Sequence, residues 1–146
     1  MAKSIYITSA EGHSGKSTVA LGVLETLSHA THRVGVFRAI ARSTHEPDYV
    51  LQMLLDHDGV DLPYEDCIGV TYDDVRRDPE AALATIVERY KAVEAQCDAV
   101  VIVGSDYTDV ASPAELGYNA RIAANLGAPV LLVVGGRSSR HQTNPE

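Results

Sequence analysis

The sequence is poor in three things: positive charge, cysteine and long apolar runs. Twelve Lys and Arg residues against twenty Asp and Glu residues give a formal net charge of −8. A surface for nucleic acid or for anionic lipid needs a basic excess, so we expect neither as a partner. The longest apolar runs have only the length of a strand, and we find no signal-peptide pattern. The expected location is the cytoplasm, without a membrane segment.

The few residues that commonly bind metals or act as nucleophiles are scattered. Cys67 and Cys97 have no metal-ligand spacing, and each adjoins a predicted strand, so we expect buried free thiols. His29 and His32 share a helix end without a third ligand, so we do not expect a metal there. No Ser/His/Asp or Cys/His arrangement can be argued, and we assign no catalytic residue.

What the sequence does contain is an alternation of strand and helix patterns in one domain. Of its 146 residues, 45% are apolar and 22% charged, as is usual for a globular chain. Strands are predicted at 4–8, 33–37, 67–70, 99–103 and 129–134. Helices are predicted over 16–29, from Pro47 to a stop at Gly59, from Pro79 onward, and from 113 to a stop at Gly127. Five strands and four helices predict an α/β fold with a doubly wound, mainly parallel sheet.

The end of the chain departs from that alternation. We expect a domain over 1–136 and a disordered tail over 137–146, because the tail has no apolar content. The fifth strand lacks the helix that should follow it, so the fold is expected to be truncated there. An uncovered sheet edge of this kind favours self-association, and we expect a homo-oligomer.

The stretch SAEGHSGKST, from Ser9 to Thr18, joins the first strand to the first helix. A glycine-containing loop in that position presents backbone N–H groups and the positive end of a helix to phosphate. The predicted phosphate or nucleotide site comprises Glu11, Gly12, His13, Ser14, Gly15, Lys16, Ser17 and Thr18. Ala10 stands where the strict pattern has glycine, and Glu11 would repel phosphate unless it turns outward or meets Mg²⁺. The alternative is a turn with a chance Gly-Lys-Ser.

A nucleotide bound with Mg²⁺ would need oxygen ligands near the loop. The Ser17 hydroxyl is one candidate, and Asp48 and Asp106 are the candidate carboxylates. For each aspartate, a helix cap or a turn is an equally good explanation. The fourth strand ends at Val103, which cannot bind a metal, so we expect weak catalysis at most. Arg38 is a candidate contact for an anion or substrate, whereas Arg42 fits a solvated surface charge.

The element order and the loop resemble the dethiobiotin synthetase and cobyrinic acid synthase group of P-loop domains. In that group a loop lysine, a loop threonine or serine and two acids handle Mg-ATP while a carboxylate substrate is activated. The resemblance gives these roles to Lys16 and Ser17, and Asp48 falls on the acid at the start of the second helix. The chain departs from the group at two positions: Arg38 replaces the lysine of YKPV, and Val103 replaces the glutamate of EG.

Longer strings resemble the N-terminal domain of multidomain bacterial phosphate acetyltransferases, especially actinobacterial ones. These strings are GVFRAI, LPYEDCIGVTYDDV, IVERYKAVEAQCDAVVIVGSDYTD and NARIAANLGAPVLLVVGG, and the resemblance covers nearly all of 1–136. It implies that a separate C-terminal domain transfers acetyl between coenzyme A and phosphate. It implies a structural or regulatory role for this domain.

Three functions follow. The first is a regulatory or binding module of a phosphate acetyltransferase, whose cofactor would be ATP or another nucleotide with Mg²⁺. The second is a stand-alone ATP-dependent ligase of the dethiobiotin synthetase type. The third is a structural domain whose loop binds nothing.

Overall fold

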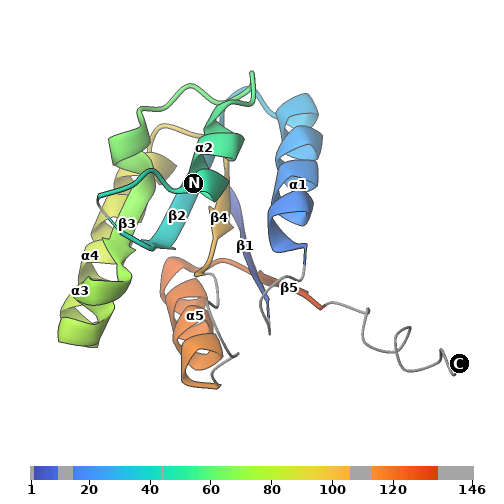
Figure 1. Ribbon diagram of the computed structural model, residues 1–146. Coiled ribbons are helices and arrows are strands. Elements are labelled where there is room, and N and C mark those ends of the chain that lie inside the picture. The colour runs from blue at the N-terminus through green and yellow to red at the C-terminus, as the bar shows by residue number, and fades with distance from the viewer. Residues whose placement is uncertain (1, 10–14, 44, 106–112, 135–146) are drawn as a thin grey trace, which may run out of the picture.

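The structure is a computed structural model that describes residues 2–9, 15–43, 45–105 and 113–134. The described chain contains one five-stranded sheet in the order β3-β2-β4-β1-β5, and every pair of neighbours is parallel (Figure 1). The strands are β1 (Lys3–Ser9), β2 (Val34–Ala41), β3 (Ile68–Thr71), β4 (Ala99–Val103) and β5 (Val130–Val133). The predicted α/β class with a parallel sheet is confirmed.

Helices connect the strands and cover both faces of the sheet. They are α1 (Lys16–Ala30), α2 (Tyr49–Leu55), the 3-10 helix η1 (Tyr64–Cys67), α3 (Tyr72–Arg77), α4 (Pro79–Glu94) and α5 (Pro113–Leu126). α1 and α2 pack on one face, and α4 and α5 pack on the other (Figure 1). Helical crossovers on both faces are what a parallel sheet requires.

The central strand β4 shows how the two faces divide the core. Val100 and Ile102 join the cluster beneath α4 and α5, whereas Val101 and Val103 join the cluster beneath α1 and α2. All five residues of β4 are buried, as the continuous apolar run predicts. Apolar side chains on both faces therefore fix this strand in the middle of the sheet.

Several predicted boundaries were wrong in ways that matter for the site. β2 runs to Ala41 rather than ending at Phe37, because residues 38–41 continue to pair with neighbouring strands. α2 begins at Tyr49 with Asp48 as its N-cap, not at Pro47. The extended β2 places Arg38 inside a strand.

The predicted set of four helices was also incomplete, because the structure contains α3 and η1 in addition. α3 begins with a capping box in which the Thr71 hydroxyl accepts from Asp74 N and the Asp74 carboxylate accepts from Thr71 N. A capping box normally has Glu or Gln at its last position, so the sequence with Asp at that position was not recognised as a helix start. The helix from Pro79, with the Asp78 cap accepting from Ala81 N, is confirmed.

Some predictions lie outside the described residues or stay untested. The proposed tail over 137–146 belongs to a range that the structure does not describe. The domain boundary at 136 stays a prediction. No helix in the described ranges is long and apolar enough to cross a membrane. Cys67 is buried and Cys97 is half-buried, and both are free thiols.

Candidate phosphate site

The site begins where β1 gives way to α1. Gly15 caps α1 with a φ of 86°, a left-handed conformation that favours glycine, and Lys16 is the first residue of the helix. Lys16 is only 5% exposed, Ser17 is half-buried and Thr18 is exposed. Glu11, Gly12, His13 and Ser14 lie outside the described residues, so their predicted roles stay predictions.

The ammonium of Lys16 crosses from α1 to the chain that leaves β4. Its Nζ donates to the carbonyl oxygen of Ser105 at 2.6 Å and to that of Gly104 at 3.2 Å. Because β1 and β4 are parallel neighbours, their carboxyl ends meet at the same edge of the sheet. The lysine of the predicted loop thus lies at the edge where ligands bind in open α/β sheets.

A second buried cation converges on the same carbonyl. The Arg38 guanidinium donates to Gly104 O, and its Nε donates to Asp48 Oδ2 at 3.1 Å. Both side chains of this ion pair are almost fully buried, at 2% and 3% exposure. Arg38 can reach Gly104 because β2 places it opposite Val103 in β4. Its proposed contact with an anion stays a prediction, whereas Arg42 is exposed, as expected.

Asp48 has a structural role whichever ligand the site takes. Its Oδ1 accepts from Leu51 N at 3.0 Å, which makes it the N-cap of α2, and its Oδ2 faces Arg38. The helix-cap explanation for this aspartate is confirmed, while its metal role stays a prediction. Asp106, the other candidate carboxylate, lies outside the described residues.

The end of β4 has no carboxylate in the position that a P-loop enzyme of the resembled group would use. Val103 is 1% exposed and belongs to the apolar cluster that contains Ala20 and Leu24 of α1. Within the described ranges, no group of three or more His, Cys, Asp or Glu side chains could hold a metal ion. The described part of the site thus contains two buried cations, Lys16 and Arg38, beside the first turn of α1.

Sequence reasoning missed a buried polar network beside this site. Ser105 N donates to Asn119 Oδ1 at 3.2 Å, and Ser105 Oγ donates to Glu115 Oε2 at 2.6 Å. Tyr72 OH donates to the same Glu115 oxygen at 3.0 Å, and Tyr6 OH donates to Asn119 Oδ1 at 2.6 Å. Burial and the nearby Glu115 carboxylate raise the pKa of Tyr72 well above its usual range. Sequence patterns do not predict this network, because its residues come from β1, α3, α5 and the segment that follows β4.

Gly104 makes this arrangement sterically feasible. A Cβ on it would lie 2.5 Å from Asn119 Oδ1 and 3.0 Å from Tyr6 Cε1. The glycine thus permits the chain after β4 to pass directly against the network. Its N–H is also used, donating to Ile7 O at 2.9 Å.

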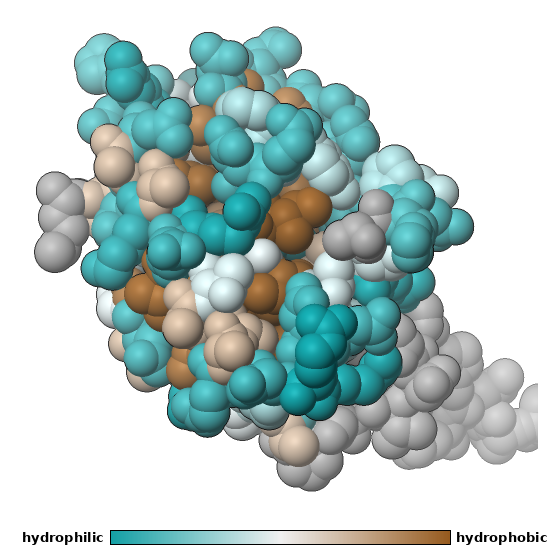
Figure 2. Space-filling model, turned by 90° about the vertical axis from the view of Figure 1, so that its left-hand side faces the viewer, coloured by the Kyte–Doolittle hydropathy of each residue, from teal (hydrophilic) through white to brown (hydrophobic). Residues whose placement is uncertain are grey.

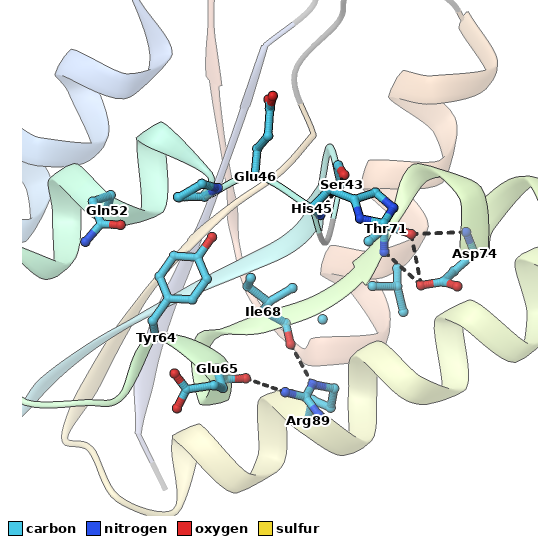
Figure 3. Close-up of a pocket in the computed structure, with 13 residues that line it drawn as sticks. Ser43, His45, Glu46, Gln52, Tyr64, Glu65, Ile68, Thr71, Asp74 and Arg89 are labelled. Atoms are coloured by element: carbon cyan, nitrogen blue, oxygen red, sulfur yellow. Dashed lines mark hydrogen bonds between the residues drawn. The ribbon is translucent and has the colours of Figure 1, made fainter.

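A separate hollow of about 690 Å³ lies at the β3 edge of the sheet. Apolar residues reach the surface on this face, with hydrophilic residues around them (Figure 2). Arg89 reaches from α4 to the carbonyl oxygens of Ile68 at 2.6 Å and Glu65 at 2.5 Å (Figure 3). Tyr64 lines the hollow, and its hydroxyl accepts from Asp48 N at 2.7 Å, which joins this wall to the Arg38 ion pair.

The strand order β3-β2-β4-β1-β5, with a buried lysine at the start of the helix after β1, defines a P-loop NTPase-like domain. A family model described as an AAA domain matches residues 3–143, so the chain belongs to that family.

Two curated relatives are both named phosphate acetyltransferase. The one from Nitratidesulfovibrio vulgaris is 35% identical over 144 residues, which cover 94% of this chain and 20% of the relative. The one from Synechocystis sp. is 30% identical over 142 residues, which cover 91% of this chain and 20% of the relative. The chain thus spans about a fifth of the length of the relatives it matches.

Proposed function

We propose that this chain is a non-catalytic binding module at the N-terminus of a phosphate acetyltransferase. A C-terminal domain of the same parent protein would convert acetyl-CoA and phosphate to acetyl phosphate and CoA. The module itself would hold phosphate or a nucleotide at the loop from Glu11 to Thr18 and serve a structural or regulatory role. The names of the two relatives and their greater length support the parentage. The free thiols of Cys67 and Cys97 suit the cytoplasm.

One observation carries the binding part of this proposal. The Lys16 ammonium lies at the carboxyl ends of β1 and β4, at the first turn of a helix of 15 residues. A helix N-terminus with a buried cation beside it suits a phosphate group. If a nucleotide binds with Mg²⁺, Lys16 would hold its phosphates and Ser17 would supply a metal ligand. Bound Mg²⁺ would neutralise phosphate charge.

Two features favour binding over turnover. Val103 fills the place of the metal glutamate with a buried methyl-bearing side chain, and Arg38 is already paired with Asp48. The alternative, a dethiobiotin synthetase-like ligase, would need both charge-handling roles to be supplied elsewhere. A mixture of Mg-ATP, bicarbonate and a diaminopelargonate-like substrate tests it, and formation of the cyclised product would favour the ligase.

The binding proposal is tested by calorimetric titration of ATP, ADP and phosphate into wild type, Lys16→Ala and Lys91→Ala. Loss of a charge-assisted lysine contact should weaken binding by about 1.5–3 kcal/mol, roughly tenfold or more. Lys91→Ala, an exposed change on α4, should leave affinity unchanged. Equal affinity of wild type and Lys16→Ala would show that this loop is not the site. We also expect no acetyl phosphate formation and little ATP hydrolysis by the chain alone.

We further propose that the module self-associates through the β5 edge. Val130 and Leu132 are 49% and 47% exposed on one face of that strand. An edge strand with an apolar face is a common site of association. Sedimentation of wild type against Leu132→Lys tests this, and an unchanged assembly state in the variant would exclude β5 as the contact.

A further inference from the structure

Ser105, the second residue after β4, makes hydrogen bonds through both its backbone and its side chain. The residue is fully buried, and its N–H donates to Asn119 Oδ1. Its hydroxyl donates to Glu115 Oε2 and accepts from Asn119 Nδ2 at 2.8 Å. Its carbonyl oxygen accepts from Lys16 at 2.6 Å. Every polar atom of this serine therefore has a partner.

The consequence concerns Lys16. An ammonium group has three donors, and two of those on Lys16 point at the Gly104 and Ser105 carbonyls. A phosphate in the loop must draw the same ammonium toward itself. The carbonyl pair and the phosphate therefore compete for one cation, and a firmly held carbonyl pair disfavours the phosphate.

We propose that Ser105 and Glu115 are positioning residues that hold these two carbonyls against Lys16 and thereby set the anion affinity of the loop. This inference rests on the proposed function, in which the loop binds an anion. Releasing the Ser105 hydroxyl from Glu115 loosens the Ser105 carbonyl, weakens its hold on the Lys16 ammonium and strengthens anion binding. A residue with a purely structural role would have the opposite effect, since loosening the fold weakens binding.

The first measurement needs no anion. Wild type, Ser105→Ala and Glu115→Gln are treated with limiting acetic anhydride, and acetylation of Lys16 is followed by mass spectrometry relative to exposed Lys3 and Lys91. Loss of the two hydrogen bonds that the Ser105 hydroxyl makes should raise the relative rate at Lys16 roughly two- to tenfold in Ser105→Ala. Glu115→Gln keeps an acceptor oxygen and should give a smaller rise. Thr85→Ala, which removes an exposed helix hydroxyl, should give none.

The second measurement is calorimetric titration of inorganic phosphate and ADP into the same variants. Ser105→Ala should bind tighter than wild type by a similar factor, and Lys16→Ala/Ser105→Ala should show no gain over Lys16→Ala.

An unchanged Lys16 acetylation rate in both network variants, or weaker anion binding by a folded Ser105→Ala, would overturn the inference. If the Lys16 rate rises while no variant binds an anion, the hold on Lys16 is supported and the proposed function fails. Because Glu115 is only half-buried, we expect the Glu115→Gln variant to fold. It therefore provides the test if Ser105→Ala does not fold.

Discussion

Arg38 Nε and Asp48 Oδ2 lie 3.1 Å apart, and this buried ion pair ties β2 to the first turn of α2. The same guanidinium holds Gly104 O, so one arginine links the sheet, α2 and the segment that contacts Lys16. A buried cation in this position depends on its counter-charge, because removing one partner leaves the other desolvated and unpaired.

Asp48→Asn should therefore destabilise the protein. The amide keeps an oxygen that can cap α2 but loses the charge facing Arg38, so we expect the free energy of unfolding to fall by about 3 kcal/mol. Urea unfolding monitored by circular dichroism measures it. Asp56→Asn, an exposed change at the other end of α2, is the matched control and should stay within about 0.5 kcal/mol of wild type. Similar stabilities for the two variants would contradict the role assigned to the ion pair.

Gly104→Ala should also be destabilising, for a steric reason. The new methyl group would lie 2.5 Å from Asn119 Oδ1, so the polar network or the backbone must move, at a cost of about 1–3 kcal/mol. Gly117→Ala is the control, since a Cβ there meets nothing within 4 Å and the residue lies within α5. Alanine in an open helical position should stabilise by about 0.5–1 kcal/mol. Thermal unfolding should thus shift the two midpoints in opposite directions, and a shift in the same direction would count against the close packing.

The two thiols should differ in reactivity. Burial raises the pKa of Cys67 to about 12, and burial also raises the pKa of Cys97, which is only half-buried. At pH 8 iodoacetamide should modify Cys97 slowly and leave Cys67 unmodified, because the thiolate is the nucleophile. In urea both should react. Rapid labelling of Cys67 in the folded protein, read by mass spectrometry, would show that this thiol is accessible.

The same raised pKa gives a prediction about alkaline pH. Folding keeps the Cys67 proton bound, so the stability that this thiol contributes is present below its ordinary pKa of 9.0 and is lost as pH rises toward about 12. The difference in unfolding free energy between wild type and Cys67→Ala should therefore shrink between pH 9 and pH 11. A constant difference across that range would contradict the assignment.

Arg89 should protect the β3 edge. One of its hydrogen bonds occupies the carbonyl oxygen of Ile68 in β3 and the other that of Glu65 in η1, and an unpaired carbonyl on an edge strand invites pairing with another chain. Arg89→Ala should lower the free energy of unfolding by about 1 kcal/mol and hasten aggregation on heating, measured by light scattering. Arg76→Ala, which removes an exposed ion pair with Asp73, should change neither property measurably.

The sequence was sufficient for the parallel α/β fold and for the position of the loop lysine. Alternating apolar runs and helical stripes are local signals, and the run from Ala99 to Val103 is apolar at every position because helices cover both of its faces. The Gly15-Lys16 pair is also a local signal, because the conformation of a left-handed glycine followed by a helix depends on residues that are adjacent in the sequence. The Asp78-Pro79 start of α4 is equally local.

Only the tertiary structure decided which partner each buried charged side chain has. Arg38 and Asp48 are ten residues apart, and the sequence could not tell a pair of ligand-binding charges from a buried ion pair, because that depends on β2 continuing past Phe37. The contact between Lys16 and the carbonyls after β4 spans 88 and 89 residues of chain and exists only because β1 and β4 are neighbours in the sheet. Local chemistry thus determined the elements and their order, whereas the partners of each buried charge depended on strand order and register, which bring distant residues together.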